Sequence, residues 1–232
     1  MQLSVKDVSE LLQVSEKTVY RWIEEGKLPG YRLNAQYRFN RYELLEWATA
    51  HRLPLSPAIF DEKEASSVPR PELGTALDAG GVFYRLDATD RESALRSIVQ
   101  VLRLPDEVDR DFLFQVLLAR ERLESTGIGG GIALPHVRSP IVLHVPKATV
   151  TLCFLENPVD FRALDDEPVQ VLFTLISPTL RAHLHLLSRL VFTLRDAEFR
   201  SLLAKQAGRE ELLKAVRHIG ASLPAPRERG GG

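Results

Sequence analysis

Apolar residues recur at helical spacing in three short segments of the first 51 residues. Ser4 and Asp7 predict a capping box, and the apolar positions after it are Val5, Val8, Leu11 and Leu12. Ser15 is suited to cap a second helix that ends at Gly26, with an inward stripe of Val19, Trp22 and Ile23. These segments predict two helices joined by a tight turn.

In the next segment the spacing of apolar residues changes from helical to alternating. Between Tyr31 and Phe39 apolar and polar residues roughly alternate around Asn34-Ala35-Gln36, which predicts a small hairpin. Asn40 and Glu43 are then placed to cap a third helix with apolar positions at Leu44, Leu45, Trp47 and Ala48. Prolines, serines and charges fill residues 54 to 71, which predicts a linker.

Beyond the linker, helical and strand patterns alternate. Apolar spacing predicts helices around 95–102 and 108–117, a helix over 180–194 and a helical stretch over 199–216. Strand candidates are 131–134, 148–155 and 169–176. We therefore expect an α/β domain with a mixed sheet flanked by helices, and four segments along the chain: 1–53, a linker 54–71, a domain 72–221 and a disordered tail 222–232.

Composition adds few constraints. The 232 residues include 44% hydrophobic and 26% charged residues, with a formal net charge of −1, so any nucleic-acid surface must be local. The one cysteine, Cys153, lies in an apolar run and favours a buried structural role. The first residues lack the pattern of a signal peptide, and no apolar run has the length of a membrane span. We expect a cytoplasmic protein without a cofactor or metal.

The second helix of the first segment is the candidate DNA reader. In a helix-turn-helix unit this helix enters the major groove and contacts DNA with the side chains outside its core stripe. The candidates are Lys17, Thr18, Tyr20 and Arg21, joined by Arg32 and Arg38 of the hairpin. Glu24 and Glu25 are expected to face away from this surface. The alternative is a small helical scaffold whose charges only keep it soluble.

The residues from Leu3 to Ile23, Gly26-Lys27-Leu28-Pro29 and the wing residues Tyr31-Arg32 and Tyr37-Arg38-Phe39 resemble excisionase-type modules related to the MerR winged helices. The resemblance covers residues 1 to about 51. It implies binding to duplex DNA.

The densest chemistry lies between Arg120 and His136. A glycine-rich loop, Ser125-Thr126-Gly127-Ile128-Gly129-Gly130-Gly131, lets backbone N–H groups approach an anion. A short apolar strand and Pro135 follow, and then His136. An unprotonated imidazole nitrogen is a nucleophile that can accept a phosphoryl group and release it again, and the Arg120 guanidinium is a candidate to steady the phosphoryl oxygens. Taken singly, a structural histidine and an ordinary glycine turn remain open alternatives.

The ordered combination resembles the type-2 enzyme IIA domains of the bacterial phosphotransferase system, which include fructose, mannitol and nitrogen-regulatory branches. The resemblance covers residues 72 to about 218. It implies that His136 is the phosphorylated histidine, that Arg120 is the active-site arginine, and that a second active-site histidine is His183, or else His185.

One departure concerns the residues after the histidine. The family usually has a small residue there, whereas Val137 and Arg138 follow here. We expect the valine to narrow the approach to the imidazole and the arginine to add positive charge beside it.

The two resemblances together predict a DNA-binding regulator that accepts a phosphoryl group on His136 from an HPr-like histidine phosphocarrier and couples phosphotransferase state to transcription. It would be a phosphohistidine carrier and not a metabolic enzyme. A regulated partner protein and a homo-oligomer are further expected partners. Two alternatives remain: a sugar-transport component that passes phosphate to a IIB domain, and a degenerate IIA domain that only binds.

Overall fold

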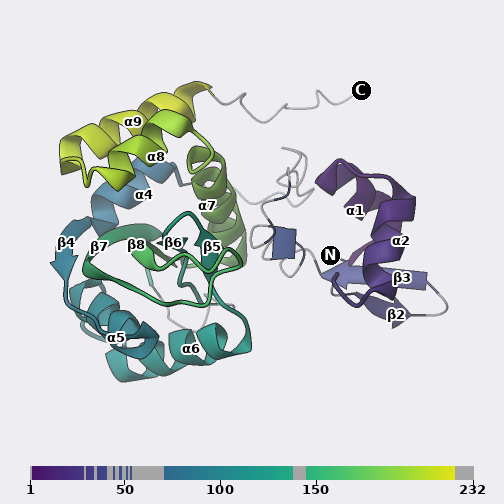
Figure 1. The fold of residues 1–232 in the computed structure, drawn as a ribbon, viewed down its shortest axis with the longest axis horizontal. Helices are drawn as coiled ribbons and strands as arrows, with labels where there is room; N and C mark the ends of the chain where they lie inside the picture. Colours follow the sequence, from purple (N-terminus) through teal and green to yellow (C-terminus); the bar gives the residue numbers. More distant parts are fainter. Residues whose placement is uncertain are drawn as a thin grey trace. The chain divides into compact units, whose positions relative to one another are not determined.

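The computed structural model of the chain describes residues 2–28, 30–33, 36–40, 44, 47–48, 51, 53, 71–137 and 145–222. These residues form two compact units, 2–53 and 71–222, which are described separately (Figure 1). The predicted linker lies outside the described residues except for Pro71, and the predicted tail lies outside them except for Ser222. The domain boundaries stay predictions.

The described residues of the first unit include two continuous helices and three strands. Its elements are β1 (Gln2–Leu3), α1 (Val5–Leu12), α2 (Glu16–Glu24), β2 (Tyr31–Leu33) and β3 (Gln36–Asn40). The strands form an antiparallel sheet in the order β1-β3-β2, with Leu3 opposite Phe39 and Arg32 opposite Tyr37. Strand β1 was not predicted, because two residues are too few to show alternation.

Local signals place the two helices as the sequence predicts. Ser4 and Asp7 make a reciprocal capping box at the start of α1, and the Ser15 hydroxyl accepts the Thr18 N–H at the start of α2. Gln13 has a φ of 55°, which turns the chain sharply between the helices. Of the predicted third helix, Leu44, Trp47 and Ala48 are helical and buried, whereas Leu45 and Glu43 lie outside the described residues and Asn40 is the last residue of β3.

The second unit is an α/β sandwich. Its strands are β4 (Val82–Leu86), β5 (Gly127–Gly129), β6 (Ile132–Ala133), β7 (Thr149–Val159) and β8 (Val169–Ile176). Its helices are α4 (Leu73–Gly80), α5 (Arg91–Val101), α6 (Arg110–Leu123), α7 (Leu180–Thr193), α8 (Ala197–Ala204) and α9 (Arg209–Ser222).

The five strands form one mixed sheet in the order β4-β7-β8-β6-β5. Strands β4 and β7 are parallel, as are β6 and β8, whereas β7 and β8 pair antiparallel over most of their length. The mixed sheet flanked by helices confirms the predicted fold class.

Alternating side chains divide the core into two clusters, one on each face of the sheet. Phe154, Phe173 and Leu175 pack on one face with residues of α4, α7, α8 and α9. Cys153, Leu172 and Ile176 pack on the other face with residues of α5 and α6 (Figure 1). The long buried runs of β7 and β8 follow from this two-sided cover, because both faces of these central strands are apolar.

Three elements of this unit were not predicted, and one predicted stretch is divided. Helix α4 contains two glycines, β4 buries only Leu86 fully, and β5 has one apolar residue, so none carries a clear period. The stretch 199–216 forms α8 and α9, because the chain turns at Gln206, whose φ is 49°. The apolar period runs across this break because both helices pack on the same cluster.

Candidate functional site

The glycine-rich segment forms a tight hairpin between α6 and the sheet. Strand β5 pairs antiparallel with β6, and Gly129, Gly130 and Gly131 connect them with φ values between 64° and 83°. Residues other than glycine rarely adopt a positive φ, which explains the run of three glycines. The Gly130 N–H donates to the Asp165 carboxylate at 2.7 Å. This loop N–H is thus used within the fold, which favours a positioning role for the glycine run.

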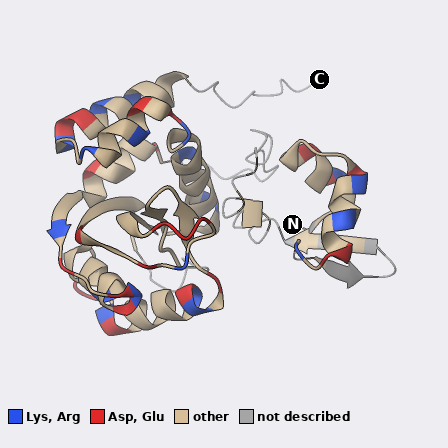
Figure 2. Cartoon of the chain, viewed as in Figure 1, with Lys and Arg blue, Asp and Glu red and all other residues tan. Residues whose placement is uncertain are grey.

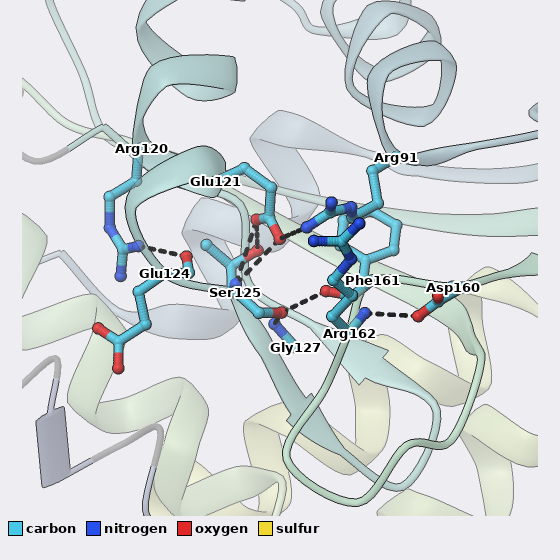
Figure 3. A network of polar contacts seen from close by, with 10 residues as sticks. Arg91, Arg120, Glu121, Glu124, Ser125, Gly127, Asp160, Phe161 and Arg162 are labelled. Carbon is cyan, nitrogen blue, oxygen red and sulfur yellow. Dashed lines mark hydrogen bonds and ion pairs between the residues drawn. The ribbon is translucent and has the colours of Figure 1, made fainter.

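Glu121 holds the start of this hairpin from the last turns of α6. Its carboxylate is almost fully buried and accepts the Thr126 N–H at 3.1 and 3.2 Å and the Thr126 hydroxyl. Arg91, at the start of α5, lies 4.0 Å from the same carboxylate (Figure 3). Burial raises the pKa of Glu121, against the opposing effects of the Thr126 hydrogen bonds and the Arg91 and Arg120 charges.

Hydrogen bonds continue from Thr126 to His136. The Thr126 carbonyl accepts the Leu134 N–H at 3.0 Å, and the Leu134 carbonyl lies 2.6 Å from Nδ1 of His136. A carbonyl only accepts, so Nδ1 carries the proton, and in the neutral ring Nε2 then carries the lone pair. The Glu121–Thr126–Leu134 chain therefore fixes both the orientation and the tautomer of the imidazole.

His136 lies three residues after β6, on the face of the sheet that α7 covers. It forms a parallel bridge with Leu175, whose side chain belongs to the cluster on that face. His183, in the first turns of α7, is fully buried, and its ring centroid lies 5.3 Å from that of His136. His185 is only partly buried, and positions two apart do not share a helix face. His183 is therefore the histidine that the fold brings beside His136.

Arg120 projects from the same end of α6 as Glu121 but in a different direction (Figure 3). Its side chain is buried, and Nη1 donates to the Glu124 carbonyl at 2.8 Å. This bond fixes the guanidinium at the entrance to the glycine hairpin, one turn before Ser125. Its predicted role toward a phosphoryl group stays a prediction.

The expectation for Val137 is wrong. Its side chain is buried with Leu113, Leu117 and Leu172 on the face of the sheet opposite to His136. Successive residues of an extended strand point to opposite faces, so the valine fills the core under α5 and α6 and does not narrow the approach to the imidazole. Arg138 lies outside the described residues.

Helix α2 of the first unit exposes most of the predicted DNA-binding residues. Lys17, Tyr20 and Arg21 are exposed, whereas Thr18 is partly buried and its hydroxyl lies 2.9 Å from that of Ser15 in the helix cap. The Tyr20 ring meets Tyr37 of β3 edge to face, with 6.1 Å between centroids. This contact joins the predicted reading helix to the wing. Arg32 and Arg38 lie in β2 and β3, and their side chains are outside the described residues.

The expected separation of charges on this unit is wrong at Glu25. Its carboxylate lies 3.9 Å from the Arg21 guanidinium and 2.8 Å from the Lys27 ammonium. The Lys27 hydrogen bond is the main cause that lowers the pKa of Glu25. Figure 2 shows this mixture of charge along α2 and after it. The pairing arises because Arg21 and Glu25 are four residues apart, which places them on one helix face.

Sequence reasoning did not identify Glu121 and Arg91 as site residues. Glu121 follows Arg120 in the motif, but the motif alone does not indicate which residues Glu121 contacts. Arg91 lies thirty residues earlier, on another helix, and no local pattern connects it with the hairpin. In the described part of the chain, no group of three or more His, Cys, Asp or Glu side chains could hold a metal ion. None of the described helices is long and apolar enough to cross a membrane.

Comparison with known protein families now adds to this geometry. The sequence profile of the family described as "Phosphoenolpyruvate-dependent sugar phosphotransferase system, EIIA 2" matches residues 75–219. The chain belongs to this family. A second profile, described as "Helix-turn-helix domain", matches residues 3–52, so the EIIA domain follows a helix-turn-helix domain. Both matches confirm the predicted domain types, and the excisionase-type and MerR relationship stays a prediction.

Curated relatives of the EIIA domain include nitrogen regulatory proteins. The chain is 41% identical over 150 residues to the Nitrogen regulatory protein of Pseudomonas aeruginosa, covering 60% of this chain and 91% of that protein. It is 32% identical over 151 residues to the protein of the same name from Escherichia coli, covering 62% and 89%. The crystal structure of Nitrogen Regulatory Protein IIA-Ntr from Neisseria meningitidis superposes with a TM-score of 0.55 at 27% identity, covering 62% and 98%.

Proposed function

We propose that the EIIA domain accepts a phosphoryl group on Nε2 of His136 from an HPr-like histidine phosphocarrier, and that the chain couples this state to transcription through its helix-turn-helix domain. The hydrogen bond from Nδ1 of His136 to the Leu134 carbonyl carries the first half of the proposal, because it directs the lone pair of the neutral ring to Nε2.

The transfer step needs no cofactor. The Nε2 lone pair attacks the phosphorus of a phosphohistidine on the carrier. The new P–N bond forms as the old one breaks, and the electron pair of the broken bond returns to the nitrogen of the carrier. The proton stays on Nδ1 of His136, which donates to the Leu134 carbonyl throughout, so the ring stays in one orientation while it gains and loses the phosphoryl group.

Arg120 and His183 are proposed to act on the phosphoryl oxygens. Arg120 provides a fixed guanidinium beside the hairpin, suited to a bidentate pair with two oxygens. His183 lies within ring contact of His136 and can donate a hydrogen bond to the third oxygen. Both side chains are already ordered by their surroundings, so they would lose little rotamer freedom in the transfer.

The DNA-binding half of the proposal depends on α2. Lys17, Tyr20 and Arg21 are exposed on the second helix of the unit, which is the helix that enters the major groove in this fold. Arg21 is suited to guanine, and Lys17 to phosphate. A DNA-binding domain has no use in sugar transport. A regulatory role therefore fits this chain better than a transport component that passes phosphate to a IIB domain.

Phosphorylation of the full chain tests the first half. The chain is incubated with phosphoenolpyruvate, enzyme I and a histidine phosphocarrier, and intact mass is measured. We expect an acid-labile adduct of one phosphoryl group that is lost in His136→Ala and forms more slowly in Arg120→Ala and His183→Ala. His185→Ala, on the same helix as His183, is the matched control and should behave as the parent. An adduct that persists in His136→Ala would place the acceptor elsewhere.

DNA binding by the full chain tests the second half. The fraction of genomic DNA fragments bound by the protein should fall steeply as the salt concentration rises, because lysine and arginine displace counterions from DNA. Arg21→Ala should cost about 1–3 kcal/mol and relax sequence preference if it reads guanine. Lys6→Ala removes a charge from α1 and should change little. Binding that is absent or independent of salt would count against DNA recognition.

Coupling between the two halves is tested on one operator. Phosphorylated and unphosphorylated full-length protein are titrated with and without cell extract, because phosphate could change either self-association or the docking of a partner protein. We expect different occupancies in at least one condition. Identical isotherms in all of them would mean that the two domains share a chain without communicating.

A further inference from the structure

Two hydroxyl groups near the end of β8 are completely buried and make no hydrogen bond within the described part of the chain. They are Oγ1 of Thr174 and Oγ of Ser177. Each hydroxyl can donate one hydrogen bond and accept two, and burial without a partner is costly. An unpartnered buried hydroxyl is therefore a feature that needs a physical explanation.

The register of the sheet places Ser177 beside His136. His136, three residues after β6, forms an isolated parallel bridge with Leu175 of β8, so both side chains point to the face that α7 covers. Ser177 lies two residues after Leu175, and alternation returns it to the same face. It is then offset from His136 by about 5 Å across the sheet and about 7 Å along it.

Thr174 lies on the other face of the same strand. It is directly opposite Thr151 of β7, and its neighbours in the alternation, Leu172 and Ile176, pack against α5 and α6. Thr174 lies within β8 and Ser177 directly follows it. The two hydroxyls are both completely buried and have no partner among the described residues, but they differ in their distance from the imidazole. This difference gives a matched control.

The start of helix α7 lies close to Ser177 in the chain. Thr179, two residues after Ser177, caps this helix, and its first turns bring the His183 ring to 5.3 Å from that of His136. The amino end of a helix of this length carries a partial positive charge. An anion attached to Nε2 of His136 would therefore meet a hydroxyl donor and a helix amino end on the same side of the sheet.

We infer that the Ser177 hydroxyl donates a hydrogen bond to an oxygen of the phosphoryl group on His136. The inference rests on the proposed function, since it requires that His136 is phosphorylated. In the unphosphorylated domain the hydroxyl is buried without a partner among the described residues, and the phosphoryl group supplies an acceptor. Ser177 thus stabilises the phosphorylated state more than the unphosphorylated one, and it sets how far transfer from the carrier proceeds.

The test compares Ser177→Ala with Thr174→Val in the full chain. Removing either hydroxyl should leave the melting temperature unchanged or raise it, because neither makes a hydrogen bond to another described residue. Each protein is then equilibrated with a fixed ratio of phosphorylated to unphosphorylated carrier, and its phosphorylated fraction is read from intact mass. Ser177→Ala should shift the equilibrium constant toward the carrier about tenfold or more, as expected for a hydrogen bond to a charged group. Thr174→Val should match the parent.

The possible results separate the two ideas. A labelled parent with equal equilibrium constants for Ser177→Ala and Thr174→Val would overturn the inference alone. A fall in the melting temperature of Ser177→Ala with unchanged phosphorylation would also overturn it, by showing a structural role. A parent that takes no label under any donor ratio would overturn the proposed function and the inference with it.

Discussion

The buried carboxylate of Glu121 provides the most direct test of how the site is held. Glu121→Ala removes the acceptor for the Thr126 N–H, which is itself in a buried residue. An unpaired buried donor costs about 1–3 kcal/mol, and the one lost methylene adds about 0.8 kcal/mol. We therefore expect the free energy of unfolding to fall by about 2–4 kcal/mol.

The assay uses the distribution of tryptophan. Both tryptophans, Trp22 and Trp47, lie in the first unit, so tryptophan fluorescence reports only on that unit during urea unfolding. Far-UV circular dichroism reports on both units. Glu121→Ala should move the circular dichroism transition and leave the fluorescence midpoint unchanged. Glu124→Ala, three residues further along and exposed, should change the stability by less than about 0.5 kcal/mol.

Glu121→Gln separates charge from shape. Because burial raises the pKa of Glu121 above its usual 4.5, the folded state holds the proton more tightly than the unfolded state. The contribution of Glu121 to stability is then complete below that usual pKa and declines as the pH rises through the folded pKa. The parent should match Glu121→Gln at acid pH and become less stable relative to it toward neutral pH.

Two results would refute this reasoning. A loss below about 1 kcal/mol in Glu121→Ala would mean that Thr126 finds another acceptor. A parent that gains stability over Glu121→Gln as the pH rises would mean that the Thr126 hydrogen bonds and the Arg91 charge outweigh burial, so that the folded pKa lies below the usual one.

Three further predictions concern single positions. Gly127→Ala should lower the melting temperature and slow phosphorylation, because the added Cβ would lie 2.8 Å from the Cβ of Ala163. Unchanged values would show that the hairpin shifts to accommodate the methyl group. Burial raises the pKa of the Cys153 thiol to about 12, so iodoacetamide should label it only in urea, and native labelling would contradict its burial. Glu25→Gln should strengthen DNA binding several-fold at low salt, because Arg21 loses its ion pair with Glu25. Unchanged titrations would show that this ion pair does not affect DNA binding.

Local chemistry in the sequence predicted the helix-turn-helix and the order of the main elements. Ser4, Ser15 and Gly26 act within a few residues of their own positions, so their caps and turns could be inferred without any tertiary contact. The same holds for the glycine run before His136, since three successive positive φ angles require glycine. The elements without a period, α4, β4 and β5, could not be predicted in this way, because packing alone defines them.

The sequence by itself determined which residue types the site contains, and only the tertiary structure decided how they meet. The motif named Arg120 and His136, but the tautomer of His136 depends on the Leu134 carbonyl, and that carbonyl is placed by a hairpin held at Glu121. The choice between His183 and His185 depends on which side of α7 faces His136. The neighbours of Val137 and Ser177 follow from strand register, because a shift of one residue would exchange the two faces of the sheet. The neighbours of His183, Val137 and Ser177 lie far away in the chain, and no local sequence pattern predicts such contacts.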